Sequence, residues 1–147
     1  MTTDEPIVFI DDDPDDHMFY QSVFHEIAPT HPLLLFTNGK QVLDYLRQTI
    51  DKPFLIIAEV NLDHATIGGI ELRRQIETDK ELRQRAIPFI FLTHPVHRHL
   101  VEDAYQLTIQ GLFEKKGSID ETRRQFRSIV DYWSDCIHPN RLDHTTY

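Results

Sequence analysis

The stretch at residues 54–63, FLIIAEVNLD, decides the fold because it joins a buried strand to an acid near the strand's end. Phe54 to Ile57 is a continuous apolar run, which is typical of a strand that is buried on both faces of a parallel sheet. Glu59 then follows in a segment that otherwise carries no charge until Asp63. A carboxylate at this place in a buried strand indicates a chemical role.

The composition limits the classes of function. A chain of 147 residues has the size of one domain with a real core, so we expect a single domain over residues 1–147. The net charge of −9 argues against nucleic acid or an anionic membrane as the partner. The single cysteine, Cys136, excludes an internal disulfide and fits a reducing compartment. The acidic start MTTDEP is unlike a signal peptide, and no apolar run approaches the roughly 20 residues of a membrane span. We therefore expect a cytoplasmic protein.

Apolar strands alternate with helical patterns along the chain. The predicted strands are 7–10, 33–36, 54–60, 87–93 and 111–114. Helices are predicted after Asp13-Pro14, after Asn38, from Gly68-Gly69 to Leu82, over about 97–107, and after the capping box that begins at Ser118. Five successive β-then-α units predict an α/β fold, a three-layer (βα)5 doubly wound parallel sheet with helices on both faces. We expect a core over about residues 6–136 and a polar, frayed tail over residues 138–147.

Polar residues follow four of the predicted strands. Functional sites of such sheets lie at the carboxyl ends of the strands, near the switch in strand order. Clustered carboxylates there repel each other by roughly 1–4 kcal/mol per close pair, so they need a cation, a lysine or protonation. Oxygen ligands suit Mg²⁺, while a hydroxyl and an ammonium suit the oxygens of a phosphoryl group. The residues concerned are Asp11, Asp12, Asp13, Glu59, Asn61, Thr93, His94 and Lys115.

From about Ile7 to Trp133 the chain resembles a response-regulator receiver domain, which has the CheY-like, flavodoxin-like fold. The segments that carry the resemblance are IVFIDDDPDD (7–16), PFLIIAEVNL (53–62), IPFIFLT (87–93) and GLFEK (111–115). Each motif alone is weak, but their order and spacing are specific. The resemblance implies that metal would be bound by Asp11, Asp12 and the backbone carbonyl of Asn61. It also implies that Thr93 and Lys115 would contact a phosphoryl group, and it places Glu59 where the family has its phosphoacceptor aspartate.

The chain departs from the family pattern around this pocket. Glu59 carries its carboxylate about 1.5 Å further out than an aspartate would, whereas in-line transfer needs reacting atoms aligned within about 3–3.5 Å. His94 stands where the family has a small residue, and Lys116 replaces the usual proline. Leu112 stands where many members have a rotating aromatic residue. We therefore expect no phosphorylation at Glu59 and weak Mg²⁺ binding.

The resemblance implies a two-component phosphorelay protein, a stand-alone receiver that acts by protein contact and is not an enzyme. Its partner would be a sensor histidine kinase or a downstream signalling protein, with homodimerisation left open. The end of the chain, DYWSDCIHPN (131–140), resembles the last helix of receivers that partner phytochrome-type kinases. The alternative is a haloacid-dehalogenase-like phosphatase using Asp11 and Asp13, although the Gly-Thr pair of that superfamily is absent.

Overall fold

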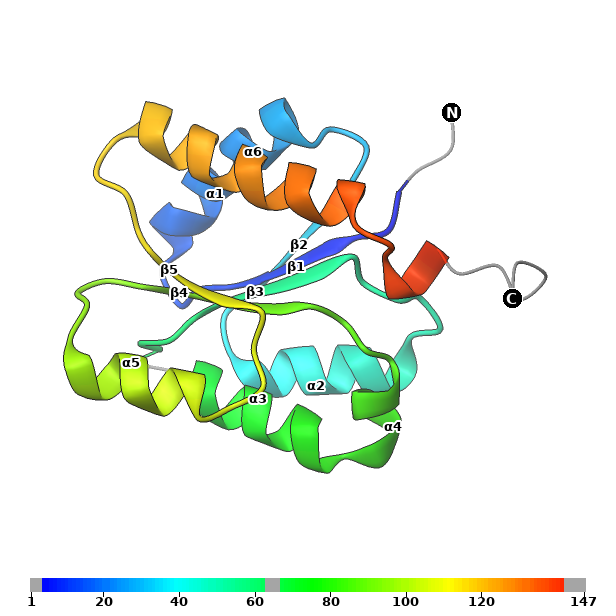
Figure 1. Ribbon diagram of the computed structural model, residues 1–147. Coiled ribbons are helices and arrows are strands. Elements are labelled where there is room, and N and C mark those ends of the chain that lie inside the picture. The colour runs from blue at the N-terminus through cyan, green and yellow to red at the C-terminus, as the bar shows by residue number, and fades with distance from the viewer. Residues whose placement is uncertain (1–3, 63–66, 142–147) are drawn as a thin grey trace.

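Five parallel strands form one sheet in the computed structural model, which describes residues 4–62 and 67–141 (Figure 1). The strand order is β2-β1-β3-β4-β5, and each strand pairs in parallel with its neighbours. This arrangement confirms the predicted (βα)5 parallel sheet. The strands are β1 (Ile7–Ile10), β2 (Leu33–Phe36), β3 (Leu55–Glu59), β4 (Phe89–Thr93) and β5 (Gly111–Glu114).

The helices lie in two layers, one on each face of the sheet (Figure 1). α1 (Pro14–Ile27) and α6 (Ile119–Asp135) lie side by side on one face. The other face is covered by α2 (Gly39–Gln48), α3 (Gly69–Thr78), α4 (Lys80–Gln84) and α5 (Arg98–Tyr105). A short 3-10 helix, η1 (Pro139–Arg141), follows α6. No helix in the described part of the chain is long and apolar enough to cross a membrane.

Apolar side chains fill both spaces between sheet and helices. The residues of β1, β3 and β4 are all buried, because these strands are covered on both faces. Phe9 on β1 contacts Phe24 of α1 and Phe126 of α6 edge to face, which joins the two helices to the sheet on one side. The three central strands are thereby held rigidly, and their carboxyl ends present a fixed edge.

Side-chain caps determine where three helices begin after the strands. Asp13 accepts a hydrogen bond from the Asp15 amide at 2.9 Å and precedes a proline at the first helical position. Asn38 caps α2, and Ser118 caps α6 by accepting from the Glu121 amide at 3.2 Å. These three starts follow the sequence prediction.

The third helix is shorter than predicted. The sequence pattern predicted one helix continuing to Leu82, but α3 ends at Thr78 and α4 begins at Lys80. Asp79 lies between them with extended backbone, and its carboxylate accepts the Leu82 amide at 3.1 Å. An aspartate that can cap a new helix competes with helix continuation, and at this position the cap forms.

The predicted frayed tail is wrong for residues 138–140. His138 is buried, and its Nε2 donates to the backbone oxygen of Phe54 at 2.7 Å. The other ring nitrogen accepts from the Asn140 amide at 3.1 Å, and the imidazole stacks on the Phe54 ring. Asn140 then donates to the backbone oxygens of Lys52 and Pro53. These contacts fix the segment against the start of β3, while residues 142–147 lie outside the described residues.

Candidate functional site

The carboxyl ends of four strands meet at one edge of the sheet, and backbone hydrogen bonds align them. The backbone amide of Asp11 donates to the backbone oxygen of Phe36 at the end of β2. The backbone amide of Lys115 donates to the backbone oxygen of Thr93 at the end of β4. Glu59 is the last residue of β3 and pairs in register with Leu92. Asp11, Glu59, Thr93 and Lys115 therefore lie at the same edge, as the sequence predicted.

A close approach of α3 fixes the backbone of Glu59. A Cβ atom at Gly69, the first residue of α3, would lie 2.6 Å from the backbone oxygen of Glu59. Only glycine allows the helix to begin this close to the strand. The start of α3 consequently packs directly against the backbone of Glu59.

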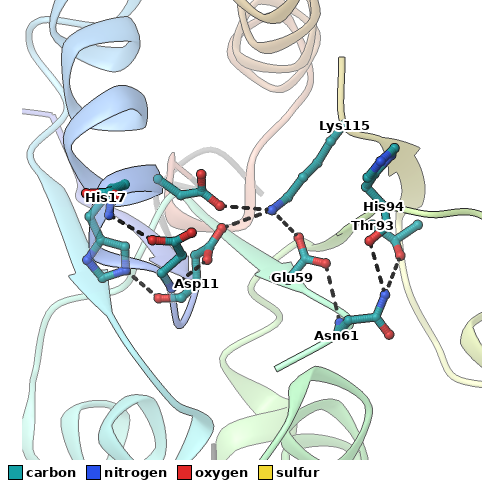
Figure 2. Close-up of polar contacts among 10 residues, drawn as sticks. Asp11, His17, Glu59, Asn61, Thr93, His94 and Lys115 are labelled. Carbon is teal, nitrogen blue, oxygen red and sulfur yellow. Dashed lines mark hydrogen bonds and ion pairs between the residues drawn. The ribbon is translucent and has the colours of Figure 1, made fainter. Parts of the chain in front are cut away.

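Glu59 forms an ion pair with Lys115, and Figure 2 shows the lysine reaching across to it. The Lys115 Nζ atom lies 2.8 Å from Glu59 Oε2, and the Glu59 side chain is only 4% exposed. The other carboxylate oxygen, Oε1, accepts a long hydrogen bond of 3.4 Å from the backbone amide of Asn61. A largely buried carboxylate is thus compensated by one ammonium.

The same ammonium contacts two further carboxylates, both from the β1–α1 region. Lys115 Nζ lies 3.2 Å from Asp11 Oδ2 and 3.3 Å from Asp16 Oδ2. The other oxygen of Asp11 accepts the Asp13 amide at 2.9 Å, and His17 hydrogen bonds to the Asp11 backbone oxygen. Lys115 is therefore the centre of a cluster in which three acids surround one cation.

Thr93 and Asn61 form a separate contact beside Glu59 (Figure 2). The Asn61 side-chain amide donates to the Thr93 hydroxyl at 3.3 Å and, more weakly, to the backbone oxygen of His94 at 3.5 Å. Thr93 is buried, whereas His94 is exposed. The hydroxyl predicted to contact a phosphoryl group is thus held by Asn61.

Burial controls the ionisation of this cluster. It raises the pKa of the Glu59 carboxyl from an ordinary 4.5 to about 7, although Lys115 favours the ionised form. Burial likewise raises the pKa of Asp11, although the hydrogen bond from the Asp13 amide and the charge of Lys115 act to lower that pKa. Burial alone would lower the pKa of Lys115, but its hydrogen bond and attraction to Glu59 outweigh this and raise that pKa. Lys115 remains cationic near neutral pH while Glu59 titrates there.

The predicted metal ligands come from the chain just after β1 and just after β3. Asp11 and Asp12 stand at the end of β1, and Asp12 is partly exposed. Within residues 4–62 and 67–141, no three acidic, histidine or cysteine side chains are grouped so that they could hold a metal. The carboxylate oxygens match the chemistry of Mg²⁺, but Lys115 already neutralises Asp11.

Two residues of the cluster, Asp16 and His17, were not predicted from the sequence. Both lie in the first turns of α1, where acidic residues are common because they stabilise a helix start. Asp16 lies in the first turn of α1, directly after the end of β1, and its carboxylate reaches Lys115. The acids between Asp11 and Asp16 could have indicated that Asp16 belongs to the site. Acidic residues are equally expected in the first turn of a helix, so the sequence does not distinguish the two roles.

Comparison with known proteins agrees with this architecture. No protein-family model matches the chain. The probable methanogenesis regulatory protein FilR2 of Methanothrix harundinacea is 25% identical over 131 residues, which cover 86% of this chain and 82% of FilR2. The response regulator Rcp1 of Synechocystis is 21% identical over 136 residues, covering 89% of this chain and 90% of Rcp1.

Solved structures resemble the whole sheet and its helices. The phosphorylated cyanobacterial phytochrome response regulator RcpA superposes with a TM-score of 0.76 at 20% identity, over 90% of this chain and 96% of RcpA. The Mn²⁺-bound form of Rcp1 gives 0.75 at 21% identity, over 91% and 97%. The receiver domain of the sensor histidine kinase PA1611 from Pseudomonas aeruginosa, with magnesium in its active-site cleft, gives 0.71 at 17% identity, over 88% and 96%. The chain therefore has the fold of the CheY-like receiver domains.

Proposed function

We propose that this chain is a receiver module of two-component signalling that acts by protein contact and is not phosphorylated at Glu59. The observation that carries the proposal is the buried ion pair of Glu59 and Lys115, with 2.8 Å between the charged atoms. Glu59 occupies the end of β3, where the resemblance places a phosphoacceptor aspartate. The chain thus keeps the lysine of the pocket but pairs it with a longer acid.

Three properties of Glu59 oppose phosphotransfer. Its side chain is almost inaccessible to a donor, at 4% exposure. One of its oxygens is taken by Lys115, the group that would otherwise stabilise the transferred phosphoryl group. The extra methylene also displaces the carboxylate by about 1.5 Å relative to aspartate, and a displacement of that order can cost about a hundredfold in rate.

The ion pair gives the pocket a charge arrangement that depends on the ionisation of Glu59 and not on phosphorylation. A glutamate supplies about −1 where phosphoaspartate would supply roughly −2. Because Lys115 also holds Asp11 and Asp16, its ammonium is fixed at the centre of the pocket. We propose that the conformation is set by these contacts, independently of a phosphorylation cycle.

We propose weak Mg²⁺ binding by Asp11, Asp12 and the backbone carbonyl of Asn61. Rcp1 and the PA1611 receiver domain bind Mn²⁺ and Mg²⁺, which supports the same class of ion for this chain. The ammonium of Lys115 beside Asp11 opposes a second cation there, because like charges repel. A bound ion would supply electrostatic stabilisation of anionic oxygens and no more.

The partners that we propose are a sensor histidine kinase or a downstream signalling protein. RcpA is a phytochrome response regulator, and PA1611 is itself a sensor histidine kinase that contains a receiver domain. The phosphatase alternative gains no support from the site. Its second acid, Asp13, is exposed and caps α1 through the Asp15 amide, so it does not face Glu59 or Lys115 as a reacting group.

Intact-mass measurement tests the proposal directly. The protein is incubated with acetyl phosphate or phosphoramidate and Mg²⁺, and the mass of the whole chain is followed with time. We expect no phosphoryl adduct on the wild type, and no turnover of an aryl phosphate. An adduct on the wild type that disappears in Glu59→Gln would show that Glu59 is a working acceptor and would overturn the proposal.

A further inference from the structure

Two buried imidazoles lie at the corner of the molecule where the chain leaves α6. His31 and His138 are both buried, and each ring stacks on the ring of Phe54, with ring centroids 4.5 and 4.7 Å from it. In Figure 1 the short helix η1, which follows His138, lies at the end of the sheet where β1 and β3 begin. Neither imidazole therefore belongs to the site at the carboxyl ends of the strands.

The two partners of the His138 ring determine which nitrogen carries the proton. Nε2 lies 2.7 Å from the backbone oxygen of Phe54, which can only accept, so Nε2 donates. Nδ1 lies 3.1 Å from the backbone amide of Asn140, which can only donate, so Nδ1 accepts. Both hydrogen bonds exist together only in the neutral ring that carries its proton on Nε2.

A second proton on His138 would break this arrangement. On Nδ1 it would turn the acceptor into a donor and set two N–H groups against each other. His138 is only 1% exposed, so water cannot replace the lost acceptor, and a buried cation with an unmatched N–H costs free energy. The docked segment therefore disfavours the second proton, whereas an imidazole in an open chain takes it up below about pH 6.5.

His31 differs from His138 in what a second proton would meet. Its Nδ1 donates to the backbone oxygen of Glu5 at 2.7 Å, and its Nε2 lies 3.6 Å from a carboxylate oxygen of Asp4. A proton on Nε2 of His31 would therefore face an anion and break no hydrogen bond. Among the described residues, the other ionisable side chains on the segments around His138 reach solvent, which screens their charges; they are Glu5, Asp51, Lys52, Asp135 and Cys136.

We propose that residues 138–140 form a pH-sensitive clasp, which holds the end of the chain against the start of β3 at neutral pH and releases it in mild acid. The released form binds one more proton than the docked form, so docking is complete above about pH 6.5 and weakens as the pH falls. Once the ring is protonated, two hydrogen bonds from the Asn140 side chain to the backbone oxygens of Lys52 and Pro53 remain. Release also removes an imidazole from its stacking contact with Phe54.

The clasp does not depend on the proposed state of Glu59. Phe54 directly precedes β3 and Glu59 is its last residue, so the clasp and the candidate site lie at opposite ends of that strand. The two proposals therefore fail independently. Because Glu59 titrates in the same pH range, the clasp has to be followed through its own contacts rather than through the free energy of unfolding.

Hydrogen exchange at the backbone amide of Asn140 measures the clasp, because docking pairs this amide with His138. Its protection, relative to an unstructured peptide at the same pH, should fall about 30-fold from pH 8 to pH 5, which is tenfold for each unit below about 6.5. Nitrogen NMR of the His138 ring at pH 8 should show the proton on Nε2. A proton on Nδ1 at pH 8, or unchanged protection of Asn140 at pH 5, overturns the proposal.

Three variants separate the proton on His138 from the strength of docking. His138→Gln keeps a side-chain donor but cannot titrate, so the pH-dependent fall should disappear. Asn140→Ala removes two hydrogen bonds and keeps the imidazole, so protection of the residue-140 amide should be lower at pH 8 and should still fall in acid. His25→Gln, at an exposed position on α1, is the matched control and should behave as the wild type.

The wild type alone decides the case if His138→Gln is released at both pH values. The His138 ring should then gain its second proton over the same pH range in which the protection of Asn140 falls. A ring that becomes protonated while Asn140 stays protected overturns the proposal. So does a fall in protection that persists unchanged in His138→Gln, because it would belong to another group.

Discussion

Glu59 and Lys115 meet across β4, because they stand at the ends of β3 and β5, the two strands that flank it. The ion pair is thus a consequence of strand order, because the two side chains must reach past the end of β4 to meet. A long acid and a long base can span that gap. The contact joins the edge strand of the sheet to its buried centre.

The first prediction concerns the pH dependence of stability. The pKa of Glu59 is raised to about 7 in the folded protein from an ordinary 4.5. The folded chain therefore keeps a proton that the unfolded chain loses between these pH values, so stability present below pH 4.5 is lost as the pH rises through 7. At 1.36 kcal/mol per pH unit the loss is about 3 kcal/mol.

Glu59→Gln should remove this loss, so the variant should exceed the wild type in free energy of unfolding at pH 8 by up to about 3 kcal/mol. The two proteins should converge at pH 4.5. Urea unfolding in the presence of a chelator measures both, and exposed Glu81→Gln is the control. Parallel pH profiles for wild type and Glu59→Gln would contradict the raised pKa.

The second prediction is that Lys115 is required for the stability of the cluster. Lys115→Met leaves Glu59 and Asp11 buried without their cation, which should cost about 3–5 kcal/mol at pH 8. The cost should be smaller at pH 5, where Glu59 is protonated. The carboxyl pKa values of Glu59 and Asp11, measured by NMR, should rise. Lys116→Met, an exposed neighbour, is the matched control, with an expected change within about 0.5 kcal/mol; equal effects of both variants would show that the ion pair contributes nothing.

The third prediction concerns Mg²⁺. Glu59→Asp shortens the acid and withdraws its carboxylate from the space between Lys115 and Asp11, which leaves more room there for a cation that demands near-octahedral geometry. We expect tighter Mg²⁺ binding by the variant than by the wild type, measured by calorimetric titration at pH 8. If the wild type binds equally well or better, the length of Glu59 does not weaken the metal site.

The fourth prediction concerns the docked segment after α6. His138→Ala removes a buried ring, its stacking on Phe54 and two backbone hydrogen bonds, so unfolding free energy should fall by about 2–4 kcal/mol. His99→Ala, at an exposed position on α5, serves as control. Hydrogen exchange at Asn140 should also accelerate in His138→Ala. A loss no larger than that of the control would mean that the segment frays after all.

The strands and the site edge could be predicted because their signals are local. Apolar runs ended by acids, a hydroxyl residue and a lysine fix where each strand stops, and parallel topology brings those ends together. Asp16 and His138 could not be predicted in the same way. Asp16 contacts Lys115, and His138 contacts the start of β3. Both partners lie far away in the sequence, so no local pattern indicates these contacts.

Helix faces were predicted less well than strand ends. In α1 the apolar Met18 is 74% exposed, while Tyr20 is buried against Phe9 and Phe126. The ring of a tyrosine carries most of its side-chain surface, so the residue can be buried although its hydroxyl is polar. The break between α3 and α4 at Asp79 was not predicted, because the apolar residues keep their helical spacing on both sides of it. An aspartate there can equally well cap a new helix.

The last prediction concerns the acceptor position itself. Glu59→Asp shortens the acid to the length that the resemblance implies for an acceptor, and it frees Lys115 from its 2.8 Å contact. The variant should therefore gain a phosphoryl adduct with acetyl phosphate and Mg²⁺ where the wild type gains none. The gain should be partial, because the exposed imidazole of His94 directly follows Thr93 at the same edge and narrows the approach of the donor.

Adding His94→Ala to Glu59→Asp should then raise the rate of labelling, measured as the fraction of the intact chain carrying the adduct over time. His97→Ala combined with Glu59→Asp is the matched control, since His97 caps α5 outside the cluster around Lys115. Full labelling of Glu59→Asp alone would show that His94 does not hinder access. Failure of every aspartate variant to label would place the block elsewhere in the pocket, at the carboxylates of Asp11 and Asp16 that continue to hold Lys115.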